Sequence, residues 1–306
     1  MFFRNLTLFR FPASLSLDLL AEGLAECALR PVGPMELATR GFVSPFGRDS
    51  EGLHHVLDGA YWLAVGGEDR LLPGSVVNAE LQKRLDDIEQ KEGRRPGGRT
   101  RKRLKDELVT ELLPRAFIRP TRVDAILDTK TGLLAVDTSS RKAAEGVVSE
   151  IRRALGSFPA LPINAEAAPR SVLTAWITAT DPDGLYEGLT LGAEAELRDA
   201  LNNNGARVRV SNMELVLNEE VEKHLQAGKQ VTRLALTLDD HVSFVLGEDL
   251  VIRKFKLLDG AVESLENTER EDLRAELEAR FALMSHELRR LFAVLEPALK
   301  LSRVDS

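Results

Sequence analysis

Apolar residues at helical spacing predict two helices in the middle of the chain. The apolar stripe of the first helix is Leu81, Leu85 and Ile88. The stripe of the second is Leu104, Leu108 and Leu112. The first helix is expected to stop at Gly93, and the second to begin at Thr100 and end before Pro114. The segment 93–99 between them holds turn residues and no apolar side chain, so the helices should fold back as a projecting antiparallel hairpin.

A longer stripe predicts a C-terminal helix from about Thr268 to Glu296. Its apolar positions step by three or four residues: Leu273, Leu277, Phe281, Met284, Leu288, Leu291 and Leu295. Thr268 and Glu271 have the spacing of a capping box at the start of this helix. Such a stripe most often packs on a sheet of the same chain, and we favour this interpretation over packing on a partner helix.

Alternating patterns predict strands on both sides of the hairpin. The expected strands are 2–11, 122–128, 133–137, 158–163 at a sheet edge, 206–210, 230–238, 241–246 and 250–257. The turn signal at 66–69 predicts a tight hairpin between short strands at 61–65 and 70–72, preceded by a loop at 41–48. Further helices are expected at 15–28 and 140–155. The fold class is therefore α+β.

Three units are expected within this α+β fold, because the 306 residues suffice for two or three small domains. Residues 1–74 together with 118–168 form a central α+β domain. Residues 75–117 form the projecting helical hairpin. Residues 169–306 form a C-terminal α+β domain that ends in the long helix.

Composition limits the class of protein. Hydrophobic residues make up 43% of the chain and charged residues 29%, which is typical of a globular protein. The single cysteine, Cys27, excludes an intrachain disulfide and a zinc site built from cysteines. No apolar run approaches the about 18 residues of a membrane span. Arg4 and Arg10 interrupt the apolar N-terminus, so a first strand is expected rather than a signal peptide, in a cytoplasmic protein.

Positive charge is concentrated around the hairpin, although the chain has 41 Lys+Arg against 48 Asp+Glu. Residues 83–122 hold 13 basic and 7 acidic side chains, and the densest stretch is KEGRRPGGRTRKRLK at 91–105. Segregated positive charge attracts polyanions through its long-range field and through release of counterions. A solvated tip is the alternative interpretation. Arginine predominates over lysine, however, and guanidinium forks suit phosphate oxygens.

Familiar catalytic motifs do not occur in the sequence. It has no GxxxxGK[ST] loop, no GxSxG elbow and no HExxH pair. Asp239-Asp240-His241 could in principle hold a divalent cation, but a polar hairpin turn between two strands fits this sequence better. We therefore expect a protein that is not an enzyme and that uses no cofactor and no metal.

Phe117 lies between Arg115 and Arg119 in the sequence LLPRAFIRP. It is either a core phenylalanine or an apolar anchor at a protein–protein contact. No other aromatic residue occurs between residues 83 and 122, which disfavours stacking of single-stranded bases and favours contact with a duplex backbone. Because no recognition-helix or zinc-finger pattern is present, binding without sequence specificity is expected.

Six segments in this order resemble the family of bacterial recombination-associated proteins RdgC. The most specific is LKDELVTELLPRAFIR at 104–119. The others are FFRNLTLFRF at 2–11, GFVSPFG at 41–47, LGSFPALPI at 155–163, AGKQVTRLALTL at 227–238 and EREDLRAELEARFALMSHEL at 269–288. The resemblance spans essentially the whole chain, although no segment is a catalytic signature.

The resemblance implies an elongated, crescent-shaped subunit that closes into a ring as a homodimer. It also implies association with the nucleoid and binding of duplex DNA without sequence preference, which restrains the RecA recombinase by competition for DNA. Phe117 is expected at an apolar contact between the projecting arms of two subunits.

The basic hairpin and the matching segments together supply the expected DNA-binding residues. They are Arg94, Arg95, Arg99, Arg101, Lys102, Arg103, Lys105, Arg115, Arg119, Lys229 and Arg233. Members of the family carry lysines where this chain has Val210 and Ser211, so Arg207 and Arg209 are expected to supply that charge. Two other functions stay open: a module that docks directly on a recombination or replication partner, and a nuclease without a familiar motif.

Overall fold

The structure is a computed structural model that describes residues 3–47, 50–178, 185–186, 188–199, 207–211, 219–266 and 273–302. The helices are α1 (Leu20–Glu26), α2 (Gly74–Glu92), α3 (Gly98–Leu112), the short 3-10 turn η1 (Leu113–Arg115), α4 (Arg141–Leu155), α5 (Pro169–Thr178), α6 (Glu219–Gln226), α7 (Asp259–Glu266) and α8 (Leu273–Leu299). The strands are β1 (Leu6–Arg10), β2 (Ala38–Val43), β3 (His54–Leu57), β4 (Ala60–Leu71), β5 (Phe117–Asp128), β6 (Leu133–Asp137), β7 (Leu161–Pro162), β8 (Leu189–Asp199), β9 (Val208–Ser211), β10 (Lys229–Leu238), β11 (Val242–Gly247) and β12 (Ile252–Leu257).

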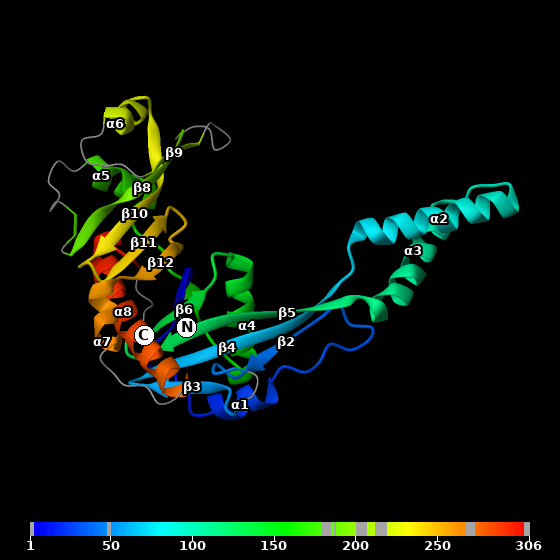
Figure 1. Cartoon of the computed structure of the whole chain (residues 1–306), viewed down its shortest axis with the longest axis horizontal. Helices are drawn as coiled ribbons and strands as arrows, with labels where there is room; N and C mark the ends of the chain where they lie inside the picture. Colours follow the sequence, from blue (N-terminus) through cyan, green and yellow to red (C-terminus); the bar gives the residue numbers. More distant parts are fainter. Residues whose placement is uncertain are drawn as a thin grey trace.

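One large antiparallel sheet runs through the molecule and confirms the α+β class (Figure 1). Its strand order is β2-β4-β5-β6-β1-β12-β11-β10-β8-β9, with β3 added to β4 and β7 added to β1. The first strand lies in the middle, because β1 pairs with β6 on one side and with β12 on the other, where Leu6 faces Ile252. The sheet therefore continues across residue 168, where we expect one domain to end.

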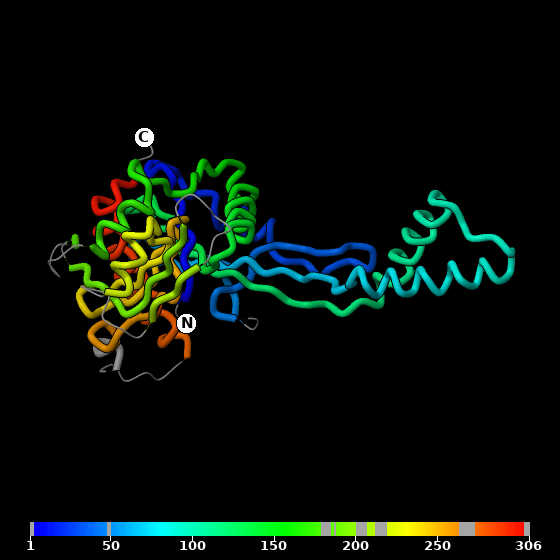
Figure 2. The backbone as a smooth tube through the Cα atoms, turned by 90° about the horizontal axis from the view of Figure 1, so that it is seen from above, coloured from blue at the N-terminus to red at the C-terminus, as the bar shows by residue number. Residues whose placement is uncertain are grey.

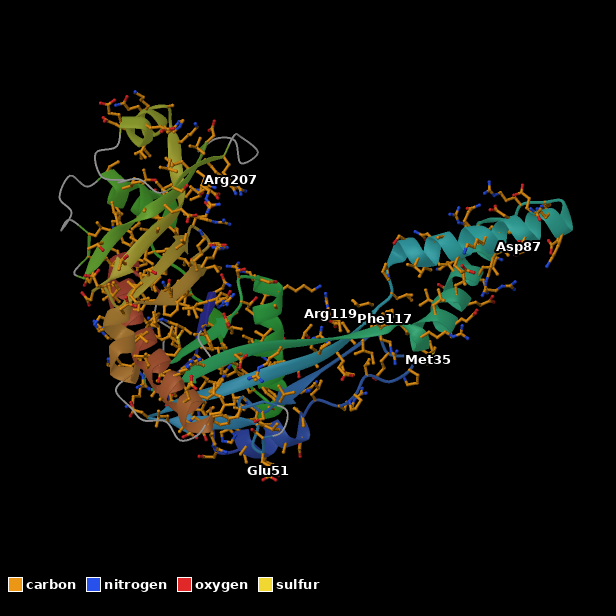
Figure 3. The ribbon with its side chains drawn as sticks, viewed as in Figure 1. Met35, Glu51, Asp87, Phe117, Arg119 and Arg207 are labelled. Atoms are coloured by element: carbon orange, nitrogen blue, oxygen red, sulfur yellow. The ribbon has the colours of Figure 1, made fainter. Side chains whose placement is uncertain are left out.

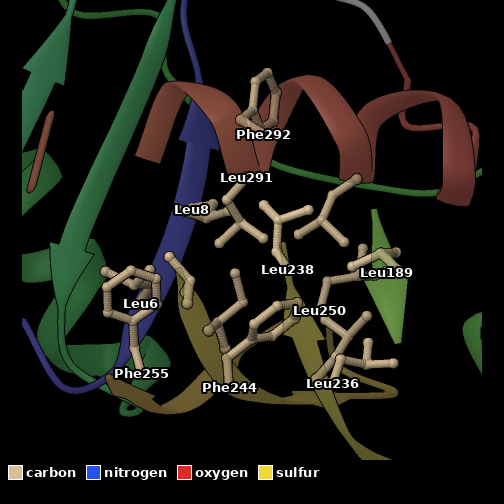
Figure 4. Close-up of a cluster of buried hydrophobic side chains, with 14 of the residues drawn as sticks. Leu6, Leu8, Leu189, Leu236, Leu238, Phe244, Leu250, Phe255, Leu291 and Phe292 are labelled. Carbon is tan, nitrogen blue, oxygen red and sulfur yellow. The ribbon is translucent and has the colours of Figure 1, made fainter. Parts of the chain in front are cut away.

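A shared hydrophobic core lies under this central part of the sheet (Figure 4). Leu6 and Leu8 of β1 are buried with Phe244 of β11 and with Leu291 and Phe292 of α8. The apolar stripe of α8 thus packs on the sheet of its own chain, as predicted, and only its first residue, Leu273, is exposed. The predicted capping residues 268 and 271 lie outside the described residues.

A second core lies between the sheet and two helices, α1 and α4. Phe9, Leu127, Val147 and Ile151 are among its buried side chains. The hydroxyl of Ser140 accepts a hydrogen bond from the backbone N–H of Ala143 at 3.3 Å and caps α4 as an N-terminal serine commonly does. The predicted helix at 140–155 is confirmed, whereas α1 is shorter than the predicted 15–28.

Strands β4 and β5 form a long ribbon that projects from the body and carries α2 and α3 at its far end (Figures 1 and 2). We call this ribbon the arm. The two strands pair without interruption from Ala60 opposite Asp128 to Leu71 opposite Phe117. The predicted turn at 66–69 and the hairpin around it are therefore wrong, and β5 begins at Phe117 instead of Arg122. The predicted loop at 41–48 is also wrong in part, because β2 extends to residue 43.

The reason for the missed strand is the packing of two glycines inside β4. A Cβ atom on Gly66 would lie 2.7 Å from a methyl carbon of Val43, and one on Gly67 would lie 2.7 Å from the hydroxyl of Thr121. Both glycines therefore lie inside a strand, where the absence of a side chain lets the side chains of neighbouring strands come close. Neither glycine forms a turn.

The hairpin of α2 and α3 has a small core of its own, made by Leu81, Leu85, Leu104 and Leu108. Helix α2 ends at Gly93 as predicted, because this glycine adopts a left-handed φ of 67° and caps the helix. Helix α3 begins earlier than predicted, at Gly98, and its first turn follows Gly97 without a side-chain cap, so Thr100 does not start it.

Candidate nucleic-acid interface

The first group of predicted residues lies on the hairpin, where all of them are exposed. They are Arg94, Arg95, Arg99, Arg101, Lys102, Arg103 and Lys105. Arg95 lies 3.6 Å from Glu89, and Arg103 lies 3.4 Å from Glu107 on the next turn of α3. Within the described chain no ion pair engages the other five, so their charges face solvent. Surface pairs of this kind are worth little energy and leave the guanidinium free to exchange partners.

The second group lies on the arm. Arg119 on β5 faces Asp69 on β4 and pairs with it at 3.3 Å, while Arg40 on β2 binds the same carboxylate at 2.5 Å. Burial raises the pKa of Asp69, but the hydrogen bonds from Arg40 and then from Arg119 outweigh it, and the net pKa is lowered. The carboxylate therefore stays charged and holds both guanidinium groups on the surface of the arm.

Phe117 is 84% exposed at the point where the arm meets the hairpin (Figure 3). Its interpretation as a core phenylalanine of the single chain is therefore wrong. Other large apolar side chains around this joint are exposed as well: Leu37, Leu71, Val76 and Ile118. We call these five residues the arm patch. Exposed apolar residues in such a group commonly mark a protein–protein contact.

A third group lies on the C-terminal half of the sheet. Along β8, Ala195 and Leu197 are buried in the core, so Glu194 and Glu196 alternate to the opposite face. We call this opposite face the inner sheet face. Figure 3 shows Arg207 there and Arg119 on the arm, both on the side of the molecule that its bend encloses.

Glu196 organises the arginines of the inner sheet face. Its side chain is 7% exposed and lies within 3.2–3.5 Å of three guanidinium groups, those of Arg198, Arg207 and Arg233. These arginines come from β8, from the residue before β9, and from β10. Burial of a carboxylate is costly unless cations and hydrogen bonds compensate it, and here three cations do so.

Glu194 holds a second pair of cations on this face. Arg209 binds it at 2.6 Å and Lys254 at 2.5 Å. Lys254 has a left-handed φ of 53° within β12, at an irregularity in the pairing with β11. Burial raises the pKa of Glu194, but the hydrogen bond and charge of Lys254, with Arg209, lower it further than burial raises it.

The inner sheet face remains positive after these ion pairs are formed. Among the described residues of this face, six cations, Arg198, Arg207, Arg209, Arg233, Arg253 and Lys254, meet three carboxylates, Glu194, Glu196 and Asp249. Sequence reasoning named only Arg207, Arg209 and Arg233 of these. The segment IRKFKL at 252–257 carried the signal for two more, because its apolar and basic residues nearly alternate.

Two predicted residues lie apart from these groups. The Nζ atom of Lys229 lies 2.9 Å from Nδ1 of His224 at the start of β10, away from the two central carboxylates. Arg115 is exposed in η1, at the base of the hairpin. The structure therefore brings Arg207, Arg209 and Arg233 together and leaves Lys229 at the margin.

In the described ranges no three His, Cys, Asp or Glu side chains are placed to hold a metal ion. Asp239 and Asp240 form the turn between β10 and β11 with left-handed φ values of 47° and 54°, which confirms the predicted polar turn. Nor does any helix in the described part of the chain reach the length and apolarity needed to cross a membrane.

The fold and its surfaces define an elongated α+β protein with exposed basic residues on a hairpin, an arm and one sheet face. The chain belongs to the RdgC family, whose model, described as "Putative exonuclease, RdgC", matches residues 1–302. Several relatives are named recombination-associated protein RdgC, and each aligns over its full length with the full length of this chain. They are 59% identical in Xanthomonas campestris pv. campestris strain B100, 60% in Xanthomonas oryzae pv. oryzae strain MAFF 311018 and 56% in Xylella fastidiosa strain 9a5c.

Proposed function

We propose that this protein binds duplex DNA without sequence preference and takes part in recombination through this binding. The observation that carries the proposal is the net positive inner sheet face, which lies on the same enclosed side of the molecule as Arg119 of the arm. Its guanidinium groups come from several strands, and guanidinium groups bind phosphate oxygens whatever the base sequence. Contacts of this kind position a protein on DNA but read no bases.

Salt dependence tests the DNA-binding proposal. Gel shifts on two unrelated duplexes should give equal affinities that fall steeply with salt, because each neutralised phosphate contributes about 0.9 to the slope of log K against log salt. Arg209→Gln should lower that slope by about 0.9. Lys130→Gln is the matched control, because Lys130 is similarly exposed and also pairs with a carboxylate, Asp58. A slope unaffected by Arg209→Gln, or affinity independent of salt, would contradict the proposal.

We further propose that two crescent-shaped copies meet at both of their ends, with the arm patch forming one of these contacts, and so close a ring around the duplex. The 84% exposure of Phe117 supports this part. Phe117→Cys should form a cross-linked dimer under mild oxidation, because the proposed contact places Phe117 at the two-fold axis, next to the same residue of the other copy. Leu161→Cys is the control, with 59% exposure on the distant strand β7, and the native Cys27 is buried. Equal cross-linking of both variants would exclude a contact at Phe117.

The proposed effect on recombination is restraint of RecA by competition for DNA. Under this proposal the inhibition of strand exchange disappears when excess duplex is added. A module that acts on a recombination partner directly would instead bind purified RecA without DNA, and inhibition would persist. The third possibility is a nuclease, and it stays open because the description of the family model names an exonuclease. Incubation of labelled DNA with Mg²⁺ or Mn²⁺ tests it, and we expect the DNA to stay intact.

A further inference from the structure

The joint between the arm and the helical hairpin decides where the hairpin points. The hairpin has its own small core, so its direction is not set by packing of that core on the main sheet. The chain enters the hairpin from the end of β4 and returns to β5 through η1. Val77 of α2 and Leu113 of η1 are buried near this joint, where the hairpin meets the arm. Apolar contact alone has little directional preference, however.

Arg70 supplies the directional contacts at this joint. It lies on β4 opposite Ile118, one position before the pair formed by Leu71 and Phe117. Its guanidinium donates hydrogen bonds to four backbone carbonyls: Nε to Gly33 at 3.2 Å, and Nη1 to Leu113 at 3.1 Å, Pro114 at 3.2 Å and Ala116 at 3.4 Å. One side chain thus connects the arm, the loop before β2 and the end of the hairpin.

The chemistry of these acceptors explains why an arginine stands here. The last carbonyls of a helix have no partner within the helix, and they carry the negative end of its dipole. Leu113 and Pro114 follow directly on α3. A planar guanidinium with five donors can bind carbonyls in different directions at once, whereas the ammonium of lysine is a compact point charge on a flexible stem. In the described chain all hydrogen-bond acceptors of the Arg70 side chain are backbone carbonyls.

We propose that Arg70 is a positioning residue that fixes the direction in which the hairpin leaves the arm. By doing so it also orients Phe117 for contact with a second copy, and this second part rests on the proposed function. In this role Arg70 does not need to touch DNA, and it does not need to lie in the contact between the two copies. It acts through the backbone of residues 113–116, from which β5 and Phe117 follow.

The direction of the hairpin can be measured without reference to DNA. Spin labels at Gln90→Cys on α2 and Lys142→Cys on α4, both exposed positions, report one distance between hairpin and body. The chain carries Cys27→Ala, and labelled protein is diluted with an excess of unlabelled protein so that only distances within one copy contribute. We expect a narrow distribution for the wild type and broad distributions for Arg70→Met and Arg70→Lys.

Arg40→Met is the matched control for the distance measurement. Arg40 lies on the neighbouring strand β2 and binds Thr39 and Asp69, without a hydrogen bond to residues 113–116. Its distribution should equal that of the wild type. An unchanged narrow distribution in Arg70→Met would overturn the proposal. If Arg70→Met fails to fold, as seen in its circular dichroism, Arg70→Lys keeps the charge and carries the same test.

Self-association tests the second part. If the competent direction is populated about a tenth of the time in Arg70→Met, the association constant should fall about a hundredfold, because both copies must point in the competent direction at once. Cross-linking through Phe117→Cys should fall with it. Broadened distances with unchanged association would overturn the link to Phe117 and leave the positioning role in place. If Phe117→Cys fails to cross-link even with Arg70 present, the proposed self-contact fails, and the distance measurement still decides on Arg70.

Discussion

Single carboxylates determine how the cations of this protein are presented. Glu196 lies beneath three guanidinium groups and is almost fully buried. A buried carboxylate without cations would be costly, so the arginines and Glu196 stabilise each other. The same carboxylate also cancels one positive charge at the surface where phosphate is proposed to bind. Structure and binding therefore place opposite demands on this residue.

Replacing Glu196 with Gln tests which demand dominates. Under the proposed function we expect Glu196→Gln to bind duplex DNA more tightly, with a salt slope steeper by about 0.9, because one more cation becomes available to phosphate. Glu150→Gln is the control, since Glu150 is also mostly buried and pairs with Arg153 at 2.7 Å on α4. Weaker binding of Glu196→Gln in gel shifts would show that the arginines need the carboxylate to keep their positions.

A second carboxylate, Glu36, controls the loop before β2. Hydrogen bonds from Arg30 and from the backbone N–H of Gly33 lower the pKa of Glu36 to about 2. A folded pKa below the unfolded value of 4.5 means that the carboxylate stabilises the loop above pH 4.5 and that this contribution is lost as the pH falls through about 2. We expect NMR titration of the Glu36 carboxyl to give a midpoint near 2. The urea-unfolded chain is the control, and a midpoint near 4.5 in the folded protein would contradict the ion pair.

At the scale of elements, the helical hairpin is a separate small unit. Leu108 is completely buried in a core with Leu81, Leu85 and Leu104. Leu108→Ala should cost about 2–5 kcal/mol, the usual range for such a deletion in a core. Because the hairpin core does not include residues of the main sheet, hydrogen exchange should rise in 74–112 and stay unchanged in 123–128. Leu112→Ala, at a half-buried position, should have a smaller effect. Equal acceleration in both segments would show that hairpin and sheet unfold together.

The elements that the sequence predicts well are those whose pattern is local. The apolar stripes of α3, α4 and α8 repeat every three or four residues, and Gly93 adds a clear stop to α2. The arm could not be predicted, because Gly66 and Gly67 carry a local turn signal while their purpose is close packing against side chains of β2 and β5. The exposure of Phe117 could not be predicted either, because the residues next to an aromatic side chain in sequence do not show whether it is buried in the core or exposed at the surface.

The candidate site was predictable to the extent that charge is visible in sequence. The basic stretch at 91–105 is contiguous, and its exposure on the hairpin was expected. The inner sheet face is assembled from β8, β9, β10 and β12, so its ion pairs join residues up to 60 positions apart, as Lys254 and Glu194 show. Pairing of distant strands determines these contacts. A single sequence without a register cannot reveal which acid neutralises which base.

At the scale of the whole molecule, helix α8 fastens the C-terminal half to the central half. Arg289 binds Asp128, the last residue of β5, at 2.7 Å, and it binds Asp58, in the turn between β3 and β4, at 2.6 Å. Farther along the helix, Arg10 of β1 binds Glu296 at 2.5 Å, and its guanidinium lies over the ring of Phe292. The halves are therefore joined by the sheet, by a shared core and by ion pairs.

Removing one of these ion pairs should lower the stability of the whole molecule. We expect Arg289→Met to reduce the free energy of unfolding by about 2 kcal/mol, because buried Asp128 loses a charged hydrogen-bond donor. Lys223→Met on α6 removes an exposed pair with Glu219 and should change stability by less than about 1 kcal/mol. Urea unfolding followed by circular dichroism distinguishes the two, and equal effects would show that Arg289 does not fasten the halves.

The central position of β1 has a consequence for how the protein is made. Strand β1 pairs along its length with residues 133–137 on one edge. On the other edge Phe9 and Arg10 pair with β7, and Leu6 pairs with Ile252 of β12, which is synthesised only when most of the chain is complete. Contacts so far apart in sequence slow folding, because a long loop must close before they form. During synthesis the Leu6 end of this edge thus stays unpaired until β12 emerges, and the nascent chain is a natural client for a chaperone until then.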